Sequence, residues 1–244
     1  MRRCIIVSIV LITTACGGSS PTSPEPEPIK QVQQLSVPSH FRGVWAEPDE
    51  ALARTSRYQA NLVILQIDSW GSDLGPLAEQ LQSRGIGTMV YVEQVFQAPR
   101  STWDAGWQRV ETWVKPLKDA GILWGFHVMD EPALNGRTGI RDEANAYVRQ
   151  RGYDVFATEW IDYVSDQGTW KSPRPAGVRW YGVTCYDYGT PRTKWHIQNC
   201  SEEYARHLDW DVVIGQAFNA GNGIPDQAKW EAIAANRSIV WWVD

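Results

Sequence analysis

The residues best suited to chemistry are carboxylates that recur at the ends of short apolar runs. Seven of the eight runs finish at or beside an acid, and these acids are Glu47, Asp68, Glu93, Asp130 with Glu131, Glu159, Asp187 and Asp244. The remaining run ends beside Gln216, with Asn219 two positions beyond the end of the run. Carboxylates that crowd one rim repel each other, which raises the pKa of some of them. Such a group suits proton transfer or metal binding, although several of these acids could simply cap the helices that follow.

Glu131 is the strongest catalytic candidate because its backbone is restricted. It belongs to the triplet Asp130-Glu131-Pro132, which follows the apolar run that contains His127. Proline disfavours the helical conformation for the residue before it, so we expect Glu131 to be extended at a strand end. The alternation of side chains along a strand then places Glu131 on the same side as Met129 and His127. His127 itself is expected to be a hydrogen-bonded core residue.

These acids need a scaffold that brings strand ends together, and the spacing of the apolar runs predicts one. The runs are Phe41–Ala46, Leu62–Asp68, Thr88–Glu93, Trp124–Asp130, Asp154–Thr158, Arg179–Tyr186, Val212–Ala217 and Ser238–Val243. Most of them are rich in Val, Ile and aromatic residues, which favour strands.

Helical patterns fill most of the gaps between these runs. They cover Asp49–Gln59, Leu74–Arg84, Thr102–Ala120, Gly139–Arg151, Ser201–Leu208 and Asp226–Asn236. Eight alternations in roughly 205 residues predict a compact α/β fold, the (β/α)8 or TIM barrel, in which the active site lies where strands end. The last helix is expected to be missing or replaced by the N-terminal segment. A doubly wound open sheet is the alternative, but no glycine-rich phosphate loop follows the first run.

The strand-four triplet resembles the (β/α)8 glycoside hydrolases of the clan A type, whose fourth strand ends in Asn-Glu-Pro or Asp-Glu-Pro. The resemblance implies that Glu131 is the general acid/base and that Asp130 contacts a sugar hydroxyl. The end of strand eight also resembles that group, which has a Trp there, and Trp241 and Trp242 match this Trp. It implies hydrolysis of O-glycosidic bonds in an oligo- or polysaccharide.

One position departs from that group. The nucleophilic Glu of the group ends strand seven, where this chain has Gln216, and a neutral amide cannot attack as a carboxylate does. Another rim acid could supply the second carboxylate, and Asp187, Glu159 and Glu93 are the candidates. The enzyme could instead be inverting, with a more distant base. The third alternative is a non-catalytic barrel that binds glycans.

The aromatic residues favour a saccharide partner, because sugar rings stack on Trp and Tyr. Fourteen Trp residues exceed what a core needs. Those at or near predicted strand ends, with neighbouring Tyr residues, are Trp45, Trp70, Tyr186, Tyr188, Trp241 and Trp242. Substrate contacts are predicted for Trp45, Asp68, Tyr186, Gln216, Asn219 and the Trp pair. Trp103, Trp107 and Trp113 have helical spacing and are expected to pack in the core.

The first residues resemble an export signal. A basic start and an apolar run, too short to span a bilayer, precede Thr13-Thr14-Ala15-Cys16. This resembles a bacterial lipoprotein signal, which implies a signal peptide over residues 1–15 and lipidation of Cys16. Residues 16–38 are rich in Pro and Ser and read as a tether, and residues 39–244 as the barrel domain. An ordinary cleaved signal is the alternative. We therefore expect an exported protein, lipid-anchored in the bacterial cell envelope.

Charge and cysteine content narrow the partners further. The formal net charge of −5 argues against a nucleic-acid partner. If Cys4 leaves with the signal and Cys16 is lipidated, Cys185 and Cys200 remain and are predicted to form a disulfide, with two free thiols as the alternative. We expect a monomer without a cofactor, and a metal held by the rim acids is the least favoured reading.

Overall fold

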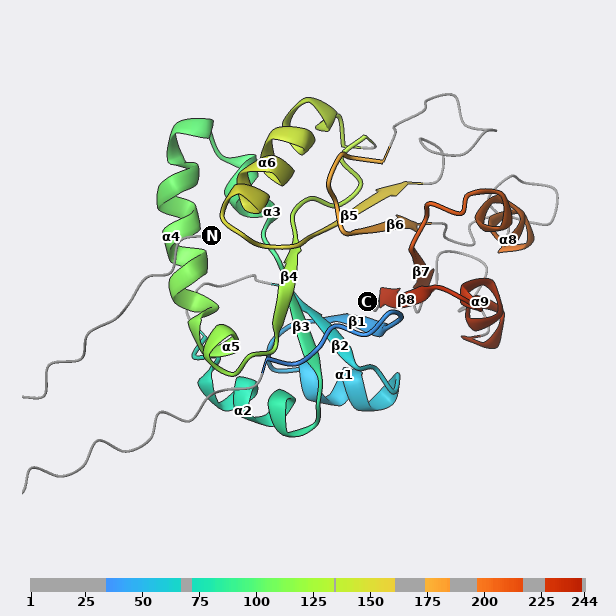
Figure 1. Cartoon of the computed structure of the whole chain (residues 1–244), viewed down its shortest axis with the longest axis horizontal. Coiled ribbons are helices and arrows are strands. Elements are labelled where there is room, and N and C mark those ends of the chain that lie inside the picture. The colour runs from blue at the N-terminus through green and yellow to red at the C-terminus, as the bar shows by residue number, and fades with distance from the viewer. Residues whose placement is uncertain are drawn as a thin grey trace, which may run out of the picture. The chain divides into compact units, whose positions relative to one another are not determined.

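The computed structural model describes residues 34–66, 72–133, 135–160, 174–184, 197–216 and 227–242. Eight parallel strands form a closed barrel in the order of the sequence, with helices outside it (Figure 1). The strands are β1 (Arg42–Ala46), β2 (Leu62–Leu65), β3 (Gly87–Tyr91), β4 (Leu123–His127), β5 (Val155–Trp160), β6 (Trp180–Thr184), β7 (Val212–Gln216) and β8 (Ser238–Trp242). The predicted (β/α)8 barrel is confirmed, and the open sheet is excluded because β8 pairs with β1.

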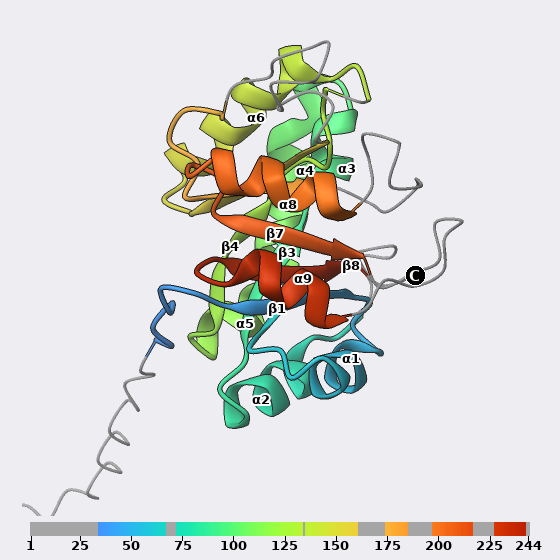
Figure 2. The ribbon, with the colours of Figure 1, turned by 90° about the vertical axis from the view of Figure 1, so that its right-hand side faces the viewer.

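The helices follow the predicted alternation. They are α1 (Ala51–Arg57), α2 (Gly75–Ser83), α3 (Glu93–Gln97), the 3-10 turn η1 (Arg100–Thr102), α4 (Trp103–Trp113), α5 (Lys115–Asp119), α6 (Thr138–Gln150), α8 (Ile197–Arg206) and α9 (Gln227–Ala234). The single helix expected over residues 102–120 is divided between α4 and α5, because Pro116 cannot continue a helical hydrogen-bond ladder. Figure 2 shows α8 and α9 on the outer side of β7 and β8. Among the described residues no helix follows β8.

Two apolar layers hold the barrel together. The outer layer lies between strands and helices and includes Trp103, Trp107 and Trp113, the helical set expected to pack there. The inner layer fills the barrel with large side chains, among them Trp124, Phe156 and Ile214. Successive strand residues alternate between the two layers, as the pleat requires.

The segment before β1 crosses the amino ends of the strands. The Leu35 amide donates a hydrogen bond to the Gly121 carbonyl oxygen, 2.8 Å away, just before β4. Leu35 and Val37 pack against the inner layer, and Phe41 lies edge-on to Trp180. This end of the barrel is therefore closed by apolar side chains. Within the described residues, no helix has both the length and the apolar character needed to cross a membrane.

Candidate active site

The loop after β4 carries the predicted acid and has an unusual backbone. β4 ends at His127, so Asp130 and Glu131 lie beyond it, and Met129 packs in the outer layer rather than on the side of His127. Glu131 has a φ of 43°, in the left-handed region, where a non-glycine residue costs about 1–3 kcal/mol. The expectation of an extended Glu131 is therefore wrong. Pro132 disfavours only the helical alternative, and the turn is closed by Asn135, whose amide donates to the Glu131 carbonyl oxygen at 3.1 Å.

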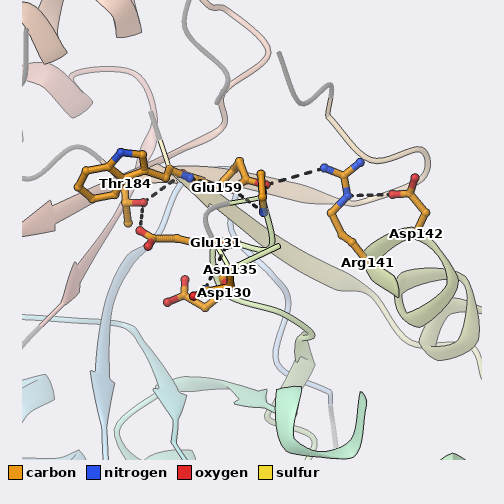
Figure 3. Close-up of polar contacts among 9 residues, drawn as sticks. Asp130, Glu131, Asn135, Arg141, Asp142, Glu159 and Thr184 are labelled. Atoms are coloured by element: carbon orange, nitrogen blue, oxygen red, sulfur yellow. Dashed lines mark hydrogen bonds and ion pairs between the residues drawn. The ribbon is translucent and has the colours of Figure 1, made fainter. Parts of the chain in front are cut away.

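The Glu131 side chain turns into the barrel mouth, where Thr184 receives it. Along β6, Trp180 lies in the inner layer and Tyr181 in the outer one, so Thr184 at the end of the strand points inward. Its hydroxyl donates a hydrogen bond to the Glu131 carboxylate (Figure 3). Glu131 is only 7% exposed.

Burial is also the main reason why Glu131 holds its proton. It raises the pKa of Glu131 above its ordinary value, and the negative charges of Asp130 and Glu159 raise it further. The Thr184 hydroxyl opposes this rise by stabilising the anion. Burial likewise raises the pKa of the neighbouring Asp130, with an opposing hydrogen bond from Thr158 and a smaller contribution from the charge of Glu93. A carboxyl group that stays protonated near neutral pH can act as a general acid.

A hydrogen-bond chain holds Asp130 beside Glu131. The Thr158 hydroxyl on β5 donates to Asp130 Oδ1 at 2.7 Å, and His127 Nε2 lies 2.9 Å from the same hydroxyl oxygen. His127 is fully buried, and burial lowers its pKa to about 3, so the ring is neutral. His127 is thus a hydrogen-bonded core residue.

The carboxylate of Glu93 is bound by two side chains and by a backbone amide. It is the first residue of α3 and only 3% exposed. The Tyr91 hydroxyl donates to it and the Arg137 guanidinium forms an ion pair with it. The Asp130 amide donates to the same carboxylate at 3.3 Å. Burial, with the charges of Asp130 and Glu93, raises the pKa of Tyr91 strongly, so this hydroxyl remains a donor.

Glu159 lies within β5 and points outward. Thr158 faces the mouth, so the next side chain faces the helices. Glu159 is fully buried, and the Ala133 amide donates to both of its carboxylate oxygens at 3.2 Å. In Figure 3 its carboxylate points toward Arg141 of α6, whose Nη1 is 3.9 Å away. Burial raises the pKa of Glu159 to about 7, against the hydrogen bonds of the Trp160 and Ala133 amides and the charge of Arg141.

The two members of the Trp pair at the end of β8 point in opposite directions. Trp242 packs in the inner layer, with its ring centroid 4.7 Å from that of Trp45, and remains partly exposed. Trp45 is itself buried beside His127. Trp241 packs on Tyr58 next to α1, with ring centroids 5.9 Å apart, so its ring lies outside the mouth. Of this pair, Trp242 alone lies on the inner side of the barrel.

Several predicted residues lie outside the described part of the chain. These are Cys16, Asp68, Cys185, Tyr186, Asp187 and Asn219. Gln216 ends β7, and its side chain also lies outside the described part. Cys200 is disulfide-bonded, whereas its pairing with Cys185 stays a prediction. Within the described residues, no cluster of three His, Cys, Asp or Glu side chains could hold a metal ion.

The sequence reasoning missed the polar residues that hold these acids. Thr158 and Thr184 occur at or near the ends of predicted strands, and alternation along each strand could have shown that they face inward. Tyr91, Arg137 and Arg141 gave no such signal, because their contacts join separate elements.

The chain thus forms a parallel (β/α)8 barrel with buried carboxyl groups at its mouth, and solved structures share its fold. No protein-family model matches the sequence, and no curated protein sequence matches it. Solved structures do match. The GH26 domain of an endo-β-mannanase/endo-β-glucanase from Prevotella bryantii has a TM-score of 0.58 at 13% identity, over 84% of each chain.

A second similar structure comes from yeast. A mutant of Saccharomyces cerevisiae Gas2p in complex with laminaritetraose and laminaripentaose has a TM-score of 0.54 at 10% identity. Another Gas2 complex, with a small compound, has a TM-score of 0.55 at 9% identity, over 84% of this chain and 57% of that chain. The present chain therefore spans little more than half of the Gas2 chains. At these identities the similarity establishes the barrel fold.

Proposed function

We propose that this protein is a glycoside hydrolase in which Glu131 protonates the glycosidic oxygen as the bond breaks. One observation carries the proposal: a buried carboxyl at the barrel mouth whose pKa is raised and whose backbone is held in the left-handed region. Strained residues persist only where the surroundings fix them, and they cluster at active sites. A general acid of this kind contributes roughly 10²–10⁴-fold to the rate.

The neighbouring groups suit a sugar. Trp242 offers a partly exposed aromatic face at the mouth, and the half-buried Asp130 offers a carboxylate for a hydroxyl. Gas2p binds laminari-oligosaccharides, and the Prevotella domain belongs to a mannanase/glucanase. We therefore propose a β-glucan or β-mannan oligosaccharide as the substrate class.

Asp187 is the second carboxylate that we propose, as nucleophile or base. Glu93 is tied to Arg137 and Tyr91, and Glu159 is fully buried behind the loop. Asp187 follows Thr184, which contacts Glu131, by three positions in the sequence. Retaining enzymes place the two carboxyl groups about 5–5.5 Å apart, and inverting enzymes roughly 6.5–9.5 Å apart.

Substitution of Glu131 tests this function. Glu131→Gln keeps the size of the side chain but removes the proton donor, so release of reducing ends should fall by roughly 10³-fold. Laminari-oligosaccharides, β-glucan and β-mannan form the panel. Glu79→Gln, at an exposed position on α2, is the matched control and should retain full activity. Unchanged cleavage by Glu131→Gln would contradict the proposal.

A non-catalytic glycan-binding protein is the second candidate, and Gln216 at the end of β7 favours it. In that case the wild-type chain would bind the same oligosaccharides without releasing reducing ends. Calorimetric titration beside the cleavage assay separates the two candidates.

We also propose that the chain is exported and lipid-anchored through Cys16. Full-length protein should partition with bacterial membranes, whereas Cys16→Ala should appear in the soluble fraction. Membrane association that is unchanged in Cys16→Ala would contradict the anchor.

A further inference from the structure

Glu159 has the contacts of a structural anchor, although it is a buried carboxylate next to the mouth. Both of its oxygens accept from the Ala133 amide at 3.2 Å, and Oε1 accepts from the Trp160 amide at 3.1 Å. Arg141, which is itself buried, faces the same carboxylate at 3.9 Å. One carboxyl group thus accepts from two backbone amides, one in the loop after β4 and one on β5.

These contacts act on the segment that carries Glu131. Ala133 follows Glu131 by two positions, so an acceptor fixed on β5 holds the turn just beyond the strained residue. On the other side of the turn, the Asn135 side chain donates to the carbonyl oxygens of Asp130 and Glu131, at 3.2 and 3.1 Å. Thr184 then fixes the carboxyl itself. The left-handed φ is thus held from three directions.

Glu159 is poorly placed to meet a substrate. It is fully buried, and its side chain points toward α6 rather than into the mouth (Figure 3). An attacking carboxylate or base must reach the anomeric carbon or a water beside it.

We propose that Glu159 is a positioning residue that anchors the Ala133 amide and so keeps Glu131 aimed at the mouth, and that it is not the second catalytic carboxylate. The inference rests on the proposed function of Glu131.

The electrostatic surroundings make this role measurable. The charges that raise the pKa of Glu131 are those of Asp130 on its own loop and Glu159 on β5. Thr184 on β6 opposes them, Arg141 on α6 faces Glu159, and Glu93, paired with Arg137, faces Asp130. Removing the charge of Glu159 should therefore lower the pKa of Glu131.

Two variants separate positioning from chemistry. Glu159→Gln keeps an acceptor for the Ala133 amide, and kcat should stay within about tenfold of wild type. Glu159→Ala removes the acceptor, and kcat should fall about 10²-fold with little change in KM, as expected when a reacting group is displaced by about 1 Å. Glu203→Gln, at a buried glutamate of α8 paired with Arg206, is the matched control and should remain near wild-type activity.

Rescue by added azide is the decisive experiment, because this small anion can replace a missing nucleophile or base. Neither Glu159 variant should be rescued by azide. Restored activity of Glu159→Ala, with a glycosyl azide as product, would overturn the proposal, and so would a loss in Glu159→Gln as large as that in Glu131→Gln.

A carbon NMR titration of the Glu131 carboxyl group measures the effect of the Glu159 charge on the pKa of Glu131, and it needs no substrate. In Glu159→Gln, its midpoint should fall relative to wild type and Glu203→Gln, because one of the charges that raises it is gone. An unchanged midpoint would overturn the proposal. This readout stands even if Glu131→Gln leaves cleavage unchanged, so failure of the proposed function and failure of the anchor are distinguishable. If Glu159→Ala does not fold, Glu159→Gln alone carries the test.

Discussion

The two ends of the barrel differ in their side chains, which are apolar at the amino end and include carboxyl groups at the carboxyl end. At the amino end, Phe41 packs against Trp124 and Trp180, with ring centroids 6.4 and 6.1 Å apart, so large apolar side chains close it. At the carboxyl end, Glu131 and Glu159 are buried and Asp130 is half-buried, and burial raises the pKa of each. Burial of apolar side chains at the amino end stabilises the folded state. At the carboxyl end, buried carboxyl groups and a strained backbone cost stability. Stability and chemistry are thus assigned to different ends of the same strands.

The amino end should be the more sensitive to loss of packing. Phe41→Ala should lower the free energy of unfolding by about 3–5 kcal/mol, because it empties a closed aromatic cluster. Cleavage activity per folded molecule should stay near wild type at a permissive temperature. Urea unfolding and kcat measured on the same preparation check this. A large fall in kcat of the folded fraction would contradict the separation of the two ends.

The carboxyl end should make stability depend on pH. For groups whose pKa is raised on folding, the folded state binds more protons than the unfolded state, so stability present at acid pH is lost as pH rises. For Glu131 and Glu159 the loss runs upward from their ordinary value of 4.5, and for Glu159 it ends near 7. The free energy of unfolding should therefore fall by about 1–3 kcal/mol between pH 5 and 7.5.

Glu131→Gln should flatten this dependence, because the amide does not titrate. Glu79→Gln, at an exposed position, should keep the wild-type slope. Urea unfolding at a series of pH values measures both. Equal slopes in wild type and Glu131→Gln would mean that Glu131 titrates alike in the folded and unfolded states.

Thr184 should matter for catalysis more than for folding. Thr184→Val removes the hydroxyl that holds the Glu131 carboxyl, and kcat/KM should fall by about tenfold through poorer orientation. Thr55→Val is the matched control, since Thr55 is a buried threonine whose hydroxyl bonds to the Ala51 carbonyl oxygen within α1. A comparable loss of kcat/KM in both variants would deny Thr184 a specific role.

Trp242 should give the smallest effect. Trp242→Ala removes the aromatic face at the mouth and should raise KM severalfold with kcat little changed, because ring stacking contributes about 1 kcal/mol. Trp241 packs outside the mouth, so Trp241→Phe should leave KM unchanged. Steady-state kinetics of both variants on the same oligosaccharide measure the two KM values.

The sequence predicted the barrel well because its signals are local. Eight apolar runs and six stretches of helical spacing alternate along the chain, and each is visible within a short window. The site was harder, because its geometry comes from contacts between elements. Pro132 suggested an extended Glu131, whereas its φ is left-handed and its carboxyl contacts Thr184 on β6.

Strand length explains why Glu159 was grouped with the rim acids. The predicted strand stopped at Thr158, so Glu159 appeared to follow it into the mouth. β5 continues to Trp160, and alternation then turns Glu159 toward α6. The same alternation turns Trp241 outward and Trp242 inward on β8. An error of one or two residues in a strand boundary thus changes the face on which a residue lies.

The central claim is that Glu131 supplies the proton that the departing sugar oxygen needs. The most direct measurement compares kcat/KM of wild type and Glu131→Gln on an unactivated oligosaccharide and on a dinitrophenyl glycoside of the same sugar, whose leaving group departs without protonation. The substitution should cost roughly 10³-fold on the oligosaccharide and less than about tenfold on the dinitrophenyl glycoside. Equal losses on both substrates, or no loss on either, would contradict the role of Glu131 as general acid.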